Sequence, residues 1–385
     1  MINPFYYYCV STSLVLIVYL LGWSNDYNSV SKEYVYVLTL IFFSNLIFGF
    51  LVNKYCKYRF IIRKQSSVGF YIVVILFVLD TLYAGTFPLL SIITGNTEHY
   101  KKLNHIPTLY PIFVALNVFF TIFYYNHYQN SKNKKKLIQV IILLLIIILG
   151  MGRGVFFVII LSLGILAISR FTLRKEGIKI KKIVFSSVIL ITIFTILGNI
   201  RPITEDRFKD FSPVEVFLKL GNAREDVKKN TLKKNLFPLY MYIVSPAGNF
   251  NYLLSNLKKE SKDFSGFIVT NFIPESFHKY FNKEIQLETR YLVNPYFNVS
   301  TSYARPFLQF KYWGIFFYQI MIFLFFLLGL SIVSKTNFRA IYLGLFSSML
   351  ILSNFSNMFI FDAFIIPVFL TILLSIPVSF KISKI

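Results

Sequence analysis

Apolar residues gather in ten windows along the chain, and short polar stretches or one long polar stretch separate them. A helix needs about 20 apolar residues to cross the roughly 30 Å hydrocarbon core of a bilayer. The pattern therefore predicts an all-α polytopic membrane protein with about ten transmembrane helices, at residues 5–23, 34–53, 68–86, 107–128, 137–152, 154–171, 181–199, 307–333, 340–357 and 358–377.

The fifth and sixth windows form one nearly continuous apolar run over residues 137–171. A single helix of that length would be about 50 Å long, too long for one crossing. Gly150, Gly152 and Gly154 surround Arg153 at the midpoint, and glycine provides the backbone freedom that a tight reversal needs. We therefore predict two helices joined by a turn with an arginine at its tip.

The composition agrees with lipid as the solvent. Hydrophobic residues make up 56% of the chain, charged residues 15%, and the mean hydropathy is +0.61, far from the balance of a soluble domain. Cys9 and Cys56 offer neither a disulfide framework nor a zinc-site spacing. No D-x-D pair, Walker loop or G-x-S-x-G elbow occurs. We expect no metal, no cofactor and no nucleic-acid partner.

The charges of the short loops predict the orientation. The loops at 54–66, 129–136, 170–182 and 334–339, with the C-terminal tail, carry 19 Lys and Arg in total, whereas the opposite short loops carry four. Short cytoplasmic loops hold the excess of Lys and Arg in membrane proteins. Both termini are therefore expected in the cytoplasm, with the chain in the bacterial inner membrane.

The one long polar stretch, residues 201–305, is then expected outside the cytoplasm. It holds 105 residues, 16 of the 40 Lys and Arg, and 11 of the 17 Asp and Glu. Residues 235–257 within it are apolar, but Pro238 and Pro246 interrupt them, which favours a re-entrant or interfacial helix pair over an eleventh span. The predicted domains are a membrane bundle (1–199), an extracytoplasmic loop (200–306) and a second membrane bundle (307–385).

Few ionisable residues fall inside the predicted spans, and those that do are expected at a similar depth in the membrane. Asp80 lies late in the third span and Asp362 early in the tenth, so both are expected in the outer half, level with Arg153 and Arg201. Such residues are costly in a bilayer and are functional candidates by default; structural ion pairs are the alternative. Arginine suits a pyrophosphate because its planar fork makes paired charge-assisted hydrogen bonds to phosphate oxygens. An interfacial anchor is the alternative for Arg153.

An acceptor hydroxyl in a transfer reaction benefits from a general base. The candidates on the outer side are His278, Glu275, Asp80 and Asp362. His99 and His105 are also expected outside, but the sequence EHYKKLNH gives them no partner at metal-site spacing.

Five stretches of the chain carry a resemblance to a known family. They are GMGRGVFF at 150–157, GNIRP at 198–202, YMYIVSPAGNFNYLL at 240–254, IPESF at 273–277 and NVSTSYARPFLQFKYWG at 298–314. With the predicted architecture, they resemble the Wzy-type polymerases, which join lipid-linked oligosaccharide repeat units into O-antigen or capsule.

The resemblance implies a glycosyltransferase that binds an undecaprenyl-pyrophosphate-linked oligosaccharide through arginines, in contact with membrane lipids and a chain-length regulator protein. The substrate-binding residues that it implies are Arg153, Arg201, Arg290, Arg305, Tyr240, Asn298, Thr301 and Tyr303. The family's last motif commonly reads D-F-G-x-x-G, whereas this chain has Gln309, Phe310, Lys311, Tyr312, Trp313 and Gly314. Because the acid and the first glycine are absent, we assign no catalytic role there.

Two other classes remain open from the sequence. One is another membrane glycosyl enzyme, either an O-antigen ligase or a polyprenyl-phosphate-sugar transferase. The other is a flippase for lipid-linked sugars, which would be expected to show paired repeats and charged residues along a path through both leaflets. Because the ionisable groups of this chain are expected only near the outer face, the pattern favours the polymerase.

Overall fold

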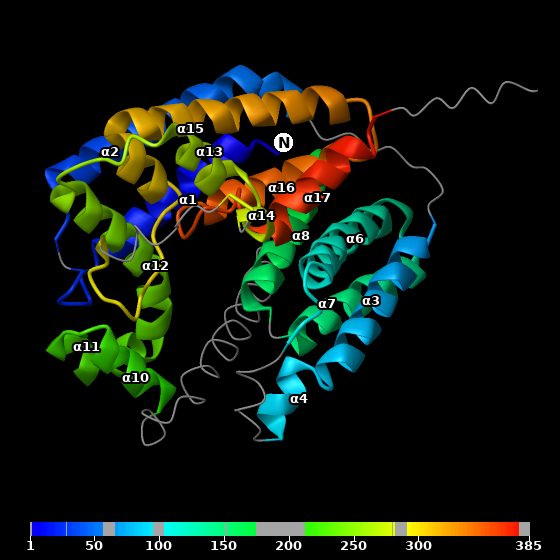
Figure 1. Cartoon of the computed structure of the whole chain (residues 1–385), viewed down its shortest axis with the longest axis horizontal. Helices are drawn as coiled ribbons and strands as arrows, with labels where there is room; N and C mark the ends of the chain where they lie inside the picture. The colour runs from blue at the N-terminus through cyan, green and yellow to red at the C-terminus, as the bar shows by residue number, and fades with distance from the viewer. Residues whose placement is uncertain are drawn as a thin grey trace, which may run out of the picture.

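The computed structural model describes residues 2–27, 29–56, 66–94, 104–150, 152–174, 212–278, 280–281 and 291–376. The described part of the chain is all-helical: about 75% of its residues are helix, and they form no strand. The helices are α1 (Pro4–Tyr19), α2 (Lys32–Val52), η1 (Asn53–Tyr55), α3 (Val68–Ala84), α4 (Pro88–Ile93), α6 (Leu109–Ser131), α7 (Lys134–Leu149), α8 (Arg153–Arg174), α10 (Pro213–Leu220), α11 (Glu225–Lys229), α12 (Thr231–Asn256), α13 (Phe264–Phe272), α14 (Glu275–His278), α15 (Ala304–Val333), α16 (Arg339–Leu352) and α17 (Asp362–Leu373) (Figure 1).

Four stretches of helix in the described part of the chain are long and apolar enough to cross a membrane: Lys32–Tyr55, Val68–Ser91, Leu109–Ser131 and Ala304–Val333. Shorter apolar helices cover most of α1, α8, α16 and α17. Nine of the ten predicted windows therefore coincide with helices, within a few residues at each end. The seventh window, 181–199, lies outside the described residues, and the number of crossings stays a prediction.

The predicted reversal between the fifth and sixth windows is confirmed as a break between two helices. Helix α7 ends at Leu149 and α8 begins at Arg153, and the two helices pack against each other. Gly152 lies in the turn, where its amide N–H donates to the Ile147 carbonyl at 3.1 Å and its own carbonyl accepts from Phe156 N at 2.8 Å. The turn thus ends one helix and begins the next within a few residues.

Basic side chains and helix ends meet at one end of the bundle, which we call the basic end; it contains Lys54, Lys132, Lys136, Arg170 and Arg339. Lys136 Nζ donates to Ser67 Oγ at 3.0 Å, Arg170 Nη1 donates to Gln129 Oε1 at 3.0 Å, and Arg339 donates to the Tyr55 carbonyl. These bonds join the start of α7 to that of α3, the end of α8 to that of α6, and the start of α16 to the end of η1.

The opposite end carries a helical cap, formed by the described residues between 212 and 303. Its longest member, α12, is one continuous helix of 26 residues. The predicted helix pair is therefore wrong: Pro238 and Pro246 lie inside α12 without dividing it, and both are buried. Figure 1 shows α10 and α11 beside the first turns of α12, and α12 running from them toward α2 and α15.

Two asparagines of α12 hold neighbouring connections in place, Asn249 within the cap and Asn251 outside it. Asn249 Nδ2 donates to the Phe297 and Val299 carbonyls at 2.6 and 2.8 Å, and its Oδ1 accepts from Val293 N at 3.1 Å. Asn251 Nδ2 donates to the Ser29 carbonyl at 2.9 Å, and its Oδ1 accepts from Ser31 N at 3.0 Å. The side chains thus supply backbone partners to two connections that have no ladder of their own.

Helix α15 bends sharply near its start. Phe310 and Lys311 leave helical geometry, and Lys311 has φ 48° and ψ −132°, a backbone conformation that favours glycine. The carbonyls of Leu308 and Gln309 accept from the backbone N–H groups of Ser261 and Lys262 at 3.1 and 3.0 Å. The segment 258–263 therefore satisfies the carbonyls that the bend releases from the helix.

Candidate functional site

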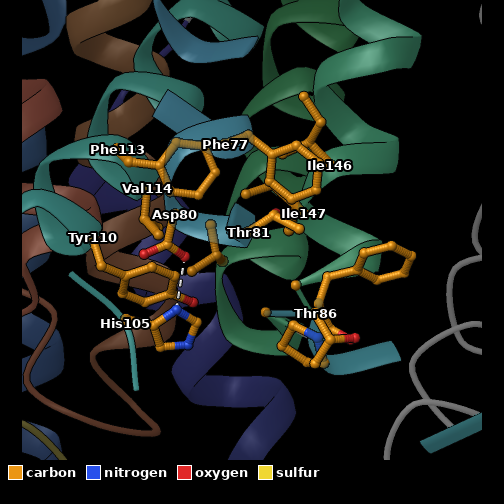
Figure 2. Close-up of a pocket in the computed structure, with 15 residues that line it drawn as sticks. Phe77, Asp80, Thr81, Thr86, His105, Tyr110, Phe113, Val114, Ile146 and Ile147 are labelled. Carbon is orange, nitrogen blue, oxygen red and sulfur yellow. Dashed lines mark hydrogen bonds and ion pairs between the residues drawn. The ribbon is translucent and has the colours of Figure 1, made fainter. Parts of the chain in front are cut away.

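The main pocket opens where α3 ends, α6 begins, α7 ends and α8 begins, at the end of these helices away from the basic end (Figure 2). Its enclosed space is about 30 Å³, and the open mouth brings the total to about 440 Å³. Its walls are Phe77, Asp80, Thr81, Thr86, Phe87, Pro88, His105, Tyr110, Phe113, Val114, Ile146, Ile147, Gly150, Gly152 and Val155. A mostly apolar pocket with a few converging polar groups is the common form of a small-ligand site.

An aspartate–histidine pair lies in this pocket. His105 Nδ1 is 2.8 Å from Asp80 Oδ2, and the amide N–H of Ile106 donates to Asp80 Oδ1 at 3.1 Å. The Asp80 side chain is 8% exposed and the His105 side chain 26% exposed. A buried carboxylate is costly unless it is paired and hydrogen-bonded, and Asp80 has a partner on each oxygen.

The His105 ring is also held from its face. Tyr110 stacks on it with ring centroids 3.8 Å apart and an interplanar angle of 21°. The chain enters α6 directly after His105, where Tyr110 N donates to the Ile106 carbonyl at 3.1 Å. The carboxylate, the tyrosine ring and the start of α6 together fix the imidazole at the pocket (Figure 2).

Helix α8 begins at the same pocket, since Gly152 and Val155 line it. Arg153 is the first residue of α8; its side chain lies outside what the structure describes. The first turn of a long helix presents backbone N–H groups without intrahelical partners and the positive end of the helix dipole. This turn and the Asp80–His105 pair therefore face one space that could accept an anionic group.

Three of the predicted catalytic residues lie together elsewhere, at α14 and the start of α17. Asp362 accepts from Ser276 Oγ at 2.9 Å and from Ser276 N at 3.3 Å, and Glu275 N donates to the Ile360 carbonyl at 2.8 Å. His278 is 6% exposed, and its Nε2 donates to the Ile273 carbonyl at 2.7 Å. These contacts hold α14 on α17; the catalytic role predicted for these residues stays a prediction.

The substrate-binding residues predicted from the motifs are dispersed. Arg305 Nη1 donates to the Thr270 carbonyl at 3.2 Å, and Tyr240 is buried with its hydroxyl accepting from Trp23 N at 3.1 Å. Asn298 is exposed, whereas Thr301 and Tyr303 line a second, smaller cavity. Arg201 and Arg290 lie outside the described residues. The two cavities share no lining residue, so Asp80 belongs to one group and Thr301 and Tyr303 to another.

Sequence reasoning missed His105 as a partner of Asp80. We considered His105 only for metal spacing, and its true partner lies 25 residues earlier in the chain. The signal was available: Asp80 falls late in one predicted span and His105 just before the next, so both were expected at the same face of the membrane.

Among the residues that the structure describes, no three His, Cys, Asp or Glu side chains come together as a metal ion would require. The chain matches no protein-family model, no curated protein and no solved structure. The function must therefore be argued from the pocket and from the architecture around it.

Proposed function

We propose that the chain is a membrane glycosyltransferase that polymerises undecaprenyl-pyrophosphate-linked oligosaccharide repeat units. It would work on the outer face of the bacterial inner membrane, with both termini in the cytoplasm and a chain-length regulator protein as a partner. The observation that carries the proposal is the pocket in which Asp80 and His105 face the first turn of α8. That pocket combines a potential proton acceptor with an anion-favouring helix start.

The arrangement of charge supports the orientation. The basic end gathers Lys54, Lys132, Lys136, Arg170 and Arg339, as a cytoplasmic end would. The pocket and the cap both lie at the end of the helices away from the basic end. A site at the outer face is where flipped lipid-linked repeat units would be presented.

In the proposed reaction, the acceptor hydroxyl of one repeat unit attacks the anomeric carbon of the growing chain. The new C–O bond forms as the bond from that carbon to the pyrophosphate oxygen breaks, and undecaprenyl pyrophosphate leaves with the electron pair. Arg153 and the first turn of α8 would stabilise the negative charge that develops on the leaving group. Arg201, Arg290 and Arg305 are the further arginines proposed for this role.

The experiment uses the purified full-length chain in lipid nanodiscs and lipid-linked repeat units extracted from a source-strain mutant that lacks it. A ladder of products supports polymerisation, whereas a single addition supports a ligase or another transferase. Arg153→Ala should abolish the ladder, and Lys135→Ala, an exposed basic residue at the start of α7, should leave it intact. Transport of repeat units without any new glycosidic bond would instead indicate a flippase.

A further inference from the structure

The bond between Asp80 and His105 determines which imidazole nitrogen is available. An ionised carboxylate only accepts hydrogen bonds, so the Nδ1 atom that faces Asp80 Oδ2 at 2.8 Å carries the hydrogen. In neutral imidazole the other nitrogen, Nε2, then holds the free lone pair. His105 is therefore held in the tautomer that can accept a proton at Nε2.

Asp80 is poorly placed to act as the base itself. Its Oδ2 binds His105, its Oδ1 accepts from Ile106 N at 3.1 Å, and its side chain is 8% exposed. With a partner on each oxygen and so little exposed surface, the carboxylate is barely open to an acceptor hydroxyl. His105 is more accessible, with 26% of its side chain exposed.

The surroundings of the ring hold it still without adding a competing charge. Tyr110 stacks on one face of the imidazole, and Thr81 and Thr86 are uncharged walls of the same pocket. Apart from Asp80 and His105, Tyr110 is the one ionisable side chain among the described walls of the pocket. Arg153 is the first residue of α8, and Val155 of the same helix is another wall of the pocket.

We propose that His105 is the general base of the reaction and that Asp80 is a positioning residue that holds its tautomer and orientation. This inference rests on the proposed function. The acceptor hydroxyl gives its proton to Nε2 as its oxygen bonds to the anomeric carbon, and undecaprenyl pyrophosphate leaves with the electron pair of the broken bond. The imidazolium then returns the proton to water. Because Nε2 must be unprotonated, the rate falls on acidification.

The test measures the initial rate of joining two lipid-linked repeat units by the full-length chain in nanodiscs. His105→Gln should lower kcat by about 10²–10⁴-fold, the usual contribution of general acid–base catalysis, with KM changed less than about threefold. Its residual rate should lack the fall at acidic pH. Asp80→Asn should also lower kcat, because an amide can hold the ring in the wrong tautomer. His127→Gln, the same change near the end of α6, is the matched control and should behave as the native chain does.

The outcomes separate the inference from the proposed function. If the native chain forms no product longer than one repeat unit, the proposed function is wrong whatever His105 does. If the native chain polymerises and folded His105→Gln keeps its kcat within about threefold and the same acid limb, the inference is overturned.

A second measurement tests the inference on the native chain, in case the His105→Gln variant does not fold. Diethyl pyrocarbonate is applied to the native chain, and mass spectrometry follows modification at each of its four histidines. Loss of activity should parallel modification of His105, lipid-linked substrate should slow both, and hydroxylamine should restore activity. Inactivation that does not follow His105 modification would refute the assignment.

Discussion

Gly314 follows the bend in α15, and replacing it with alanine tests whether that bend is obligatory. A Cβ atom at this position would lie 1.9 Å from the Pro306 carbonyl oxygen and 2.7 Å from its carbon. Both are backbone atoms, so no flexible side chain can move away. The segment that carries Pro306 is also fixed, because Ser261 and Lys262 donate to the carbonyls of Leu308 and Gln309. Relief therefore requires the bend to open.

The expected cost can be estimated from these contacts. Overpacking of this kind costs about 1–3 kcal/mol, and two disturbed backbone hydrogen bonds add about 1 kcal/mol each. The better helix propensity of alanine returns about 1 kcal/mol. Gly314→Ala should therefore destabilise the chain by about 3 kcal/mol.

The control is Gly164→Ala in α8, where an added Cβ meets nothing within 4 Å. The two variants make the same chemical change in apolar helices, so they differ mainly in the space available. We expect Gly164→Ala to unfold at or slightly above the native temperature in detergent, and Gly314→Ala well below it, at one scan rate. Equal midpoints for the two variants would show that the bend is not needed, and the reasoning would fail.

Three further predictions use other features. Lys311→Gly should stabilise the chain by about 1 kcal/mol, because relief of about 1–3 kcal/mol of backbone strain exceeds the loss of a partly exposed ion pair with Glu260 and the entropy cost of glycine. The control, Lys219→Gly inside α10, should lower the unfolding temperature. Asn249→Ala should lower the free energy of unfolding by about 3 kcal/mol, because three backbone groups of 293–299 lose their partner, and it should speed proteolysis of that segment. Asn256→Ala, which loses one exposed hydrogen bond, is the control, and equal behaviour of the two variants would contradict the prediction. Polymerisation should persist in excess EDTA, since the chain has no D-x-D pair, and loss restored by Mg²⁺ would disprove metal independence.

The positions of the apolar helices could be predicted from the sequence because hydropathy records burial in lipid directly. The turn before Arg153 could also be predicted, since a 35-residue apolar run exceeds one crossing and its glycines mark the break. The continuity of α12 could not be predicted from local signals. Pro238 and Pro246 argue for an interruption, and only their packing in the folded cap keeps one helix.

The bend in α15 and the Asp80–His105 pair depend on contacts between distant segments. Lys311 lies in a sequence that reads as continuous helix, and the backbone groups of Ser261 and Lys262 that support the bend are some fifty residues away. Asp80 and His105 sit at opposite ends of a connection whose path hydropathy does not specify. The sequence therefore indicated their shared level but not their hydrogen bond.

The two asparagines of α12 also impose an order on synthesis. Asn251 binds Ser29 and Ser31, which the ribosome has made more than two hundred residues earlier, whereas Asn249 binds residues 293–299, which emerge 44 to 50 residues later. The backbone groups of residues 29–31 therefore stay hydrated until α12 has been synthesised and folded. Asn249 of α12 in turn gains its backbone partners only after the segment that precedes α15 has been made. A nascent chain that stalls before residue 293 lacks the Phe297 and Val299 carbonyls that accept from Asn249 Nδ2, a form that membrane quality-control proteases could distinguish from the finished protein.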